Sequence, residues 1–257
     1  MGNGVCGFLA LLKISEGLTQ GTNAIAQAAS YHWAAWLILA GMVFDAMDGR
    51  VARMTRTTSN FGAQLDSLCD LITFGVTPGL LVYAVCHTAT FLPNRVVEVV
   101  AVLYVMCALI RLARFNVESS PDEKSHQEFA GLPSPAAAGV VATSVIPWTA
   151  FPEYTFFDAS WQFVLKGLPI IAFVIAILMV SRIRYAHVVN RVLRGYRPFV
   201  TLVELVLVFV LVALLHEFAL FVAFLGYTIA GPMLWFRRGV FRRPAPDVSA
   251  HRDESWF

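Results

Sequence analysis

Four aspartates are concentrated in one short stretch of an otherwise apolar chain. Asp45 and Asp48 are three residues apart, and Asp66 and Asp70 are four residues apart. On an α-helix, either spacing puts both carboxylates on one face. Converging carboxylates repel one another and are costly to remove from water, but two divalent cations would cancel the four charges. Because all the ligands are oxygens, the pattern predicts a site for two Mg²⁺ or Mn²⁺ ions.

The residues between the two pairs favour a phosphate-bearing ligand. Gly49 and Ala52 lie on the helix face of the first pair and leave it without bulk, so that a flat base or a diphosphate could approach the backbone. Arg53 offers a forked donor to phosphate oxygens one turn later, and Ser59 adds a hydroxyl in the connecting loop. Charges that merely cap helix ends would not explain aspartates near a helix C-terminus, where the helix dipole disfavours them.

The elements that position these residues are predicted to be membrane helices. Hydrophobic residues make up 58% of the 257, charged residues make up 14%, and the mean hydropathy is +0.66. Such a composition excludes an ordinary soluble domain, in which about 25% of residues are charged. We therefore expect an all-α, polytopic membrane protein with about eight helices, the first of them short. The expected helices lie near 4–12, 32–54, 62–86, 95–116, 133–151, 162–184, 198–215 and 218–236.

The distribution of basic residues predicts the orientation of the chain. If residues 50–61 face the cytoplasm and the segments alternate, sixteen of the nineteen Lys and Arg residues lie on the cytoplasmic side. Cytoplasmic loops are enriched in these residues. We therefore expect a multi-pass protein of a bacterial-type cytoplasmic (inner) membrane, with its active site facing the cytoplasm. The membrane domain would cover residues 1–236, followed by a basic, disordered tail at 237–257.

Other classes of protein find little support in the composition. A net charge of +2 is too small to indicate nucleic-acid binding by charge alone. The four cysteines form no CxxC pair and lie in apolar surroundings, which disfavours thiolate metal sites and disulfides. The sequence has no internal repeat and no inverted pair of broken helices, which argues against a transporter.

The acidic stretch also resembles a known family signature. Its fixed positions read Asp45-x-x-Asp48-Gly49-x-x-Ala52-Arg53, then eight residues, then Gly62-x-x-x-Asp66-x-x-x-Asp70. This closely resembles the signature of the CDP-alcohol phosphatidyltransferases. Four further stretches resemble the branch of that family that makes phosphatidylserine: CGFLAL at 6–11, DSLCDLITFGVTPG at 66–79, IRLARFN at 110–116 and FAGLPSPAAAG at 129–139. The resemblance covers roughly residues 2–150.

The resemblance implies a metal-assisted transfer in which an acceptor hydroxyl displaces CMP from CDP-diacylglycerol. It assigns two Mg²⁺ or Mn²⁺ ions to Asp45, Asp48, Asp66 and Asp70. It assigns CDP-diacylglycerol to Gly49, Ala52, Arg53, Ser59 and Asn3. Asp70 would also be the general base, because a carboxylate within reach can accept the hydroxyl proton. The family further suggests a homodimer in the bilayer, with no nucleic-acid partner.

A second group of polar residues points to the acceptor. Arg111 and Arg114 are one helical turn apart, and Asn116 follows them. A forked guanidinium suits the carboxylate of free serine, so L-serine is the expected acceptor. The alternative for either arginine is a side chain that snorkels or satisfies the positive-inside bias.

Two other hypotheses stay open at this stage. The same chemistry could use glycerol phosphate, inositol phosphate or choline as the acceptor. The four aspartates could instead be the ion site of a divalent-cation transporter. Gly49, Ala52 and Arg53 argue against that hypothesis, because a cation pathway has no need of an arginine beside its ligands.

Overall fold

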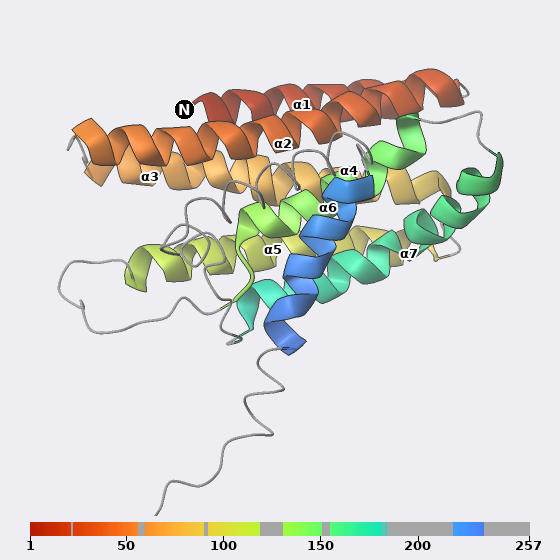
Figure 1. The fold of residues 1–257 in the computed structure, drawn as a ribbon. Helices are drawn as coiled ribbons and strands as arrows, with labels where there is room; N and C mark the ends of the chain where they lie inside the picture. The colour runs from red at the N-terminus through yellow and green to blue at the C-terminus, as the bar shows by residue number, and fades with distance from the viewer. Residues whose placement is uncertain are drawn as a thin grey trace, which may run out of the picture.

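The computed structural model describes residues 1–21, 23–55, 60–89, 92–118, 131–150, 155–181, 183 and 218–233. All regular elements in these ranges are helices, which confirms the all-α prediction for this part of the chain. Figure 1 shows α1, α2 and α5 running roughly along one axis, with α6 behind a helix at Phe218–Met233 that crosses them obliquely.

The first two helices are both longer than the sequence predicts. α1 spans Gly2–Thr19 rather than 4–12, because the polar segment beyond the apolar piece stays helical, with an exposed ion pair of 2.7 Å between Lys13 and Glu16. Its 18 residues correspond to roughly 27 Å, close to the thickness of a bilayer core. α2 spans Ala24–Thr55 and begins eight residues before the predicted start at 32. The Asn23 side chain accepts a hydrogen bond from the Ala26 amide at this N-terminus.

The third predicted helix has an unexpected irregularity. α3 spans Asn60–Asp70 and α4 spans Thr77–Ala89, and a six-residue π-helix, η1, joins them at Leu71–Val76. The Thr77 amide donates to the Ile72 carbonyl, five residues back, and the Thr77 hydroxyl donates to the same oxygen at 2.7 Å. π-Turns inside α-helices occur frequently at functional sites, and this one begins directly after Asp70.

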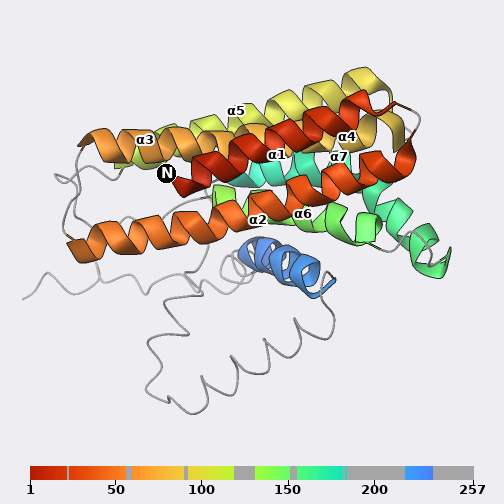
Figure 2. The same ribbon diagram turned by 90° about the horizontal axis from the view of Figure 1, so that it is seen from above.

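The remaining described helices complete a bundle around a core of small side chains. α5 spans Asn94–Glu118, α6 spans Ser134–Ala150 and α7 spans Thr155–Val180. α1 packs along α2, α2 packs against α6, and α5 packs against α7. Viewed from above, the helix at Phe218–Met233 lies beside α6 (Figure 2). The predicted helix at 198–215 and the tail at 237–257 lie outside the described residues, so the count of about eight helices stays a prediction.

The small residues of α6 allow it to lie at the centre of the bundle. Every residue from Ala136 to Pro147 is buried, and so is Ser134 at the start of the helix, while Pro135 is partly exposed. The hydroxyls of Thr143 and Ser144 are satisfied within the helix, since each donates to the carbonyl four residues back at 2.7 Å.

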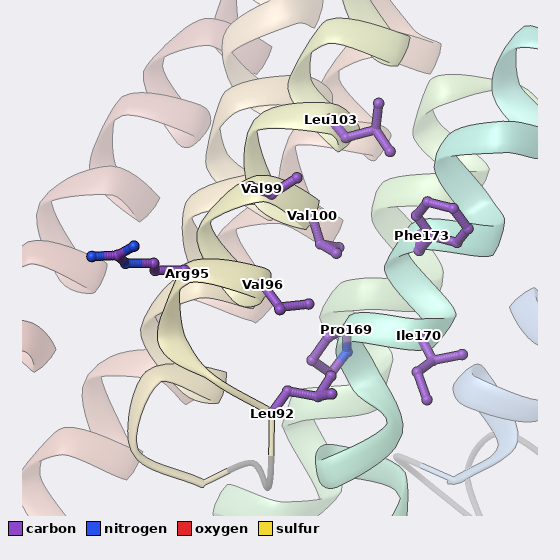
Figure 3. Close-up of a pocket in the computed structure, with 9 residues that line it drawn as sticks. All are labelled: Leu92, Arg95, Val96, Val99, Val100, Leu103, Pro169, Ile170 and Phe173. Atoms are coloured by element: carbon purple, nitrogen blue, oxygen red, sulfur yellow. The ribbon is translucent and has the colours of Figure 1, made fainter.

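The outer surface of the bundle is apolar in many places. Among the described residues, the helices Phe61–His87 and Asn94–Val117 are long and apolar enough to cross a membrane. Exposed large side chains such as Val99 and Ile177 are typical of a surface that meets lipid rather than water. Figure 3 shows a groove of about 510 Å³ between α5 and α7, which Val96, Pro169 and Phe173 line while the Arg95 side chain points away. This groove lies at the N-terminal end of α5, away from the aspartates.

Candidate active site

Three carboxylates from two helices meet at one end of the bundle. Asp45 comes from α2, and Asp66 and Asp70 come from α3. One oxygen from each lies within 4.8 Å of the others. Because α2 and α3 are joined by a short connection and run antiparallel, Asp45 of the first acidic pair meets both members of the second pair. Asp66 is exposed, while Asp45 and Asp70 are half-buried.

Asp48 lies beside this carboxylate cluster but is not one of its three members. Its Oδ2 accepts a hydrogen bond from the amino group of Met1 at 2.6 Å. This bond raises the pKa of the Met1 amine. Asp48 is also near enough to repel the carboxylates of Asp45 and Asp66, so a fourth negative charge borders the cluster.

The donor set of the cluster fits a hard divalent cation. Three carboxylates this close repel one another strongly, and desolvation adds to the cost of keeping them ionised. A cation between them would offset both effects, and an all-oxygen set suits Mg²⁺ or Mn²⁺. The described residues therefore provide a site that fits the metal chemistry expected of the signature.

The N-terminal part of α1 contacts Asp70 through a hydrogen bond from Asn3. The Asn3 side chain is completely buried, and its Nδ2 donates to Asp70 Oδ1 at 2.6 Å. The Thr73 hydroxyl in η1 donates to the Asn3 carbonyl at 3.0 Å, and the Thr77 hydroxyl donates to the Gly7 carbonyl at 3.3 Å. These bonds fix α1 to the helix that carries Asp70.

Two glycines permit the close approach of α1 to that helix. A Cβ added to Gly7 would lie 2.9 Å from the Thr73 Cα, and one added to Gly4 would lie 2.7 Å from the Cys69 Sγ. Real Cβ atoms are not found so close to such neighbours, and a contact with backbone leaves little room for adjustment. The glycines of the first turns of α1 are therefore a packing requirement of the site.

Arg111 enters the site from the C-terminal half of α5. Its Nη1 donates to the Ser134 hydroxyl, at the start of α6, at 2.5 Å. Its positive charge attracts the negative charge of Asp70. The structure therefore brings a predicted acceptor-binding residue together with the predicted general base.

The backbone before Ser134 fixes the start of α6. Gly131 has a φ of +95°, which favours glycine, and its amide donates to the Ile183 carbonyl at 2.9 Å. The Leu132 amide donates to the Leu178 carbonyl in the last turn of α7 at 3.0 Å. The chain leading into α6 is thereby docked on the end of α7, which places Ser134 against Arg111.

Asn116 lies at the level of α3. Its side-chain amide and the Ser67 hydroxyl are 3.0 Å apart (Nδ2 to Oγ). α5 packs against α4 and η1, and its C-terminal end reaches α3, where Asn116 pairs with Ser67. Arg111, one to two turns earlier on α5, comes near Asp70. Arg114 is half-buried on the same helix.

The other predicted binding residues are placed only in part. The helix α2 includes Gly49, Ala52 and Arg53, but the structure describes only their backbone. Ser59 lies outside the described residues altogether. The structure thus neither brings these side chains together with the cluster nor separates them from it.

Two tyrosines near Arg111 have no counterpart in the sequence predictions. Tyr104 is completely buried on α5 and donates from its hydroxyl to the Phe74 carbonyl of η1 at 3.3 Å. Tyr227, on the helix Phe218–Met233, is near enough for its charged form to interact with Arg111. Single tyrosines in apolar helices carry no spacing signal, so only the fold could reveal their proximity to Arg111.

Comparison with known proteins identifies a large region of similarity. The sequence profile of the CDP-alcohol phosphatidyltransferase family matches residues 5–180. The chain is 34% identical over 218 residues to the CDP-diacylglycerol–serine O-phosphatidyltransferase of Helicobacter pylori strain J99, covering 84% of this chain and 85% of that protein. It is 36% identical over 144 residues to the Saccharomyces cerevisiae protein of the same name, covering 54% of this chain and 49% of that protein. The Methanocaldococcus jannaschii protein of that name is 31% identical over 156 residues, covering 61% of this chain and 65% of that protein.

Proposed function

Because the chain belongs to the CDP-alcohol phosphatidyltransferase family, we propose that it transfers the phosphatidyl group of CDP-diacylglycerol to the hydroxyl of L-serine, giving phosphatidylserine and CMP. One observation carries the proposal: Arg111, which would bind the acceptor, is close enough to interact electrostatically with Asp70, a member of the carboxylate cluster that would accept the proton. The names of the relatives support serine as the acceptor.

The carboxylates would hold two Mg²⁺ or Mn²⁺ ions. Asp45, Asp66 and Asp70 offer three ligands within 4.8 Å, and Asp48 is the neighbouring fourth. Bound there, the ions would offset negative charge on the diphosphate and on the departing CMP. The protein's own task is to hold the carboxylates in position and to admit the diphosphate.

The CDP group would lie along the C-terminal part of α2. Gly49 and Ala52 leave the helix face open, and the guanidinium of Arg53 offers two parallel donors to phosphate oxygens. Ser59 would add a hydroxyl from the loop. The acyl chains would remain in the bilayer beside the apolar outer surface.

Asp70 would act as the general base. The serine oxygen forms a bond to the phosphorus of the phosphatidyl group, and the bond from that phosphorus to the CMP oxygen breaks, with the electron pair leaving on CMP. Asp70 accepts the hydroxyl proton as the new bond forms. Its hydrogen bond to Asn3 occupies one oxygen, Oδ1, so the second oxygen can serve the proton or a metal.

Arg111, Arg114 and Asn116 would bind the acceptor. Serine presents one carboxylate, which a guanidinium can bind through two parallel hydrogen bonds. Ser134 holds the Arg111 side chain at 2.5 Å, and Ser67 bonds Asn116. These partners would keep both side chains oriented before serine arrives.

The proposal also includes the setting of the enzyme. The family is membrane-associated, and we propose a multi-pass protein of a bacterial-type inner membrane, forming a homodimer, with the site on the cytoplasmic side. The concentration of Lys and Arg in the loops on that side supports the orientation. The tail at 237–257 would stay in the cytoplasm.

The decisive experiment uses purified protein in detergent with CDP-diacylglycerol and Mg²⁺ or Mn²⁺. CMP release is measured with L-serine, glycerol phosphate, inositol phosphate and choline in parallel. Serine should be the acceptor that drives turnover, and CDP-diacylglycerol with metal should raise the melting temperature. Turnover with another acceptor would reassign the substrate, and indifference to the nucleotide would favour a cation transporter.

A further inference from the structure

The hydrogen bond of Asn3 to Asp70 indicates that Asn3 supports a carboxylate of the cluster and does not contact the substrate. Its Nδ2 donates to Asp70 Oδ1 at 2.6 Å. An ionised carboxylate only accepts hydrogen bonds, so the amide must turn its NH₂ group towards Asp70. We infer that Asn3 is a positioning residue, which fixes the orientation of the Asp70 carboxylate and does not bind CDP-diacylglycerol. The inference rests on the proposed function and adds a residue that supports its metal site.

The burial of Asn3 argues against direct contact with a lipid nucleotide. The residue is 0% exposed, and its Nδ2 is already engaged by Asp70. Any ligand that reached it would have to displace α1 from α2 and η1. That movement would break the close packing of Gly4 against Cys69 and of Gly7 against Thr73.

The second atom of the amide shows that packing alone does not explain an asparagine here. Asn3 Oδ1 is buried and has no hydrogen-bond partner among the described residues. It lies against α2, where a Cβ added to Gly41 would be 3.2 Å away. An unsatisfied buried acceptor costs free energy, and a leucine of similar size would avoid that cost. The bond to Asp70 is the interaction that requires an amide.

The backbone of Asn3 is held on the same helix that carries Asp70. The Thr73 hydroxyl donates to the Asn3 carbonyl at 3.0 Å, and Thr73 lies three residues after Asp70. One residue of α1 is thus tied to the Asp70 helix through both its side chain and its main chain. The main-chain bond anchors α1, while the side-chain bond orients the carboxylate before a metal or substrate binds, as supporting residues do around metal ligands.

The test compares three variants of the full-length protein in the same detergent. Asn3→Leu keeps a branched side chain with the same number of heavy atoms and removes the donor, and Asn3→Ala removes the donor with less bulk. Thr73→Val is the matched control, because it removes the neighbouring hydrogen bond between α1 and η1 and leaves the bond to Asp70. Mn²⁺ affinity is measured by electron paramagnetic resonance, together with melting temperature, CMP release and the KM for CDP-diacylglycerol at saturating Mn²⁺.

We expect both Asn3 variants to lose roughly 10- to 100-fold in Mn²⁺ affinity or kcat, the usual effect of removing a residue that supports a metal ligand. The KM for CDP-diacylglycerol should stay within about twofold of the unmodified protein. Thr73→Val should lower the melting temperature comparably but keep Mn²⁺ affinity. Unchanged Mn²⁺ affinity and kcat in both Asn3 variants, or an equal loss in Thr73→Val, would overturn the inference.

The Mn²⁺ measurement separates this inference from the proposed function. If the unmodified protein releases no CMP with serine but the Asn3 variants still lose Mn²⁺ affinity, the acceptor is wrong and the positioning role stands. If serine drives turnover and the KM for CDP-diacylglycerol rises selectively in the Asn3 variants, Asn3 binds the nucleotide and the positioning role is wrong.

Discussion

The guanidinium of Arg111 and the hydroxyl of Ser134 join the C-terminal half of α5 to the first residue of α6. The Nη1 of Arg111 donates to Ser134 Oγ at 2.5 Å, while its charge attracts that of Asp70. The side chain is therefore held between two helices on the side of the carboxylate cluster. This position leads directly to a prediction about the acceptor.

Arg111→Ala should raise the KM for serine by roughly 10- to 100-fold, because hydrogen bonds to charged groups contribute about 1.5–3 kcal/mol. The KM for CDP-diacylglycerol should change far less. Ser134→Ala is the control: it keeps the guanidinium and removes only its support, so its effect on serine should be smaller. Steady-state CMP release measures both constants, and equal losses for the two substrates would assign Arg111 to the diphosphate or to folding.

Asp70→Asn should lower turnover by roughly 100-fold or more, the usual scale for losing a general base. CDP-diacylglycerol binding should largely survive, since the other carboxylates remain and an amide oxygen is still a weak ligand. Asp45→Asn should instead weaken metal and nucleotide binding together. Near-normal turnover in Asp70→Asn would mean that another group accepts the proton.

Removal of the metal should abolish turnover, and added Mg²⁺ or Mn²⁺ should restore it. The two-ion proposal further predicts that Asp48→Asn lowers the Mn²⁺ stoichiometry from two to one, because Asp45, Asp66 and Asp70 still form the cluster without it. Equilibrium dialysis with Mn²⁺ measures this directly. A stoichiometry of one in the unmodified protein would contradict the second ion.

Gly49→Leu should abolish binding of CDP-diacylglycerol and leave the protein folded, because a side chain there would fill the space that the base and phosphates need. Gly167→Leu is a matched control on α7, since a Cβ added there meets no atom within 4 Å. Ligand-induced stabilisation, measured as a shift in melting temperature, distinguishes the two. Normal stabilisation of Gly49→Leu would show that this helix face is not the nucleotide site.

Gly7→Ala should destabilise the protein by about 1–3 kcal/mol, the usual cost of overpacking a close contact. Its Cβ would lie 2.9 Å from the Thr73 Cα, so backbone would have to move. Gly167→Ala, with open space around it, should be neutral or slightly stabilising. Thermal unfolding in detergent compares them, and equal stability would mean that α1 can shift freely.

The parts of the site that the sequence predicts are those with a repeating spacing. Asp45, Asp66 and Asp70 converge because helical periodicity and a short connection leave few alternatives. The bond between Asn3 and Asp70 spans 67 residues, and the bond between Arg111 and Ser134 spans 23. Such pairs depend on how helices pack, which a single sequence does not specify.

The fold shows the same division between periodic and local signals. Apolar stretches predict α5 and α6 to within two residues at their described ends. The length of α1 is underestimated because Lys13 and Glu16 interrupt the apolar pattern while they pair with each other on an exposed face. The π-helix at Leu71–Val76 has no composition of its own, since its residues would suit an α-helix equally well.

The π-helix η1 sets the rotation of α3 relative to α4, which follow one another in one continuous helical segment. An α-helix turns by roughly 100° per residue, and a wide turn absorbs one residue without breaking the segment. Shortening Leu71–Val76 by one residue, so that it closed as an α-helix, would swing Asp66 and Asp70 by roughly 100° relative to α4. The direction in which Asp66 and Asp70 point from α3 is thus set independently of the direction in which α4 points its apolar side chains. The carboxylates and the apolar surface of one continuous helical segment can therefore each take the orientation that they need.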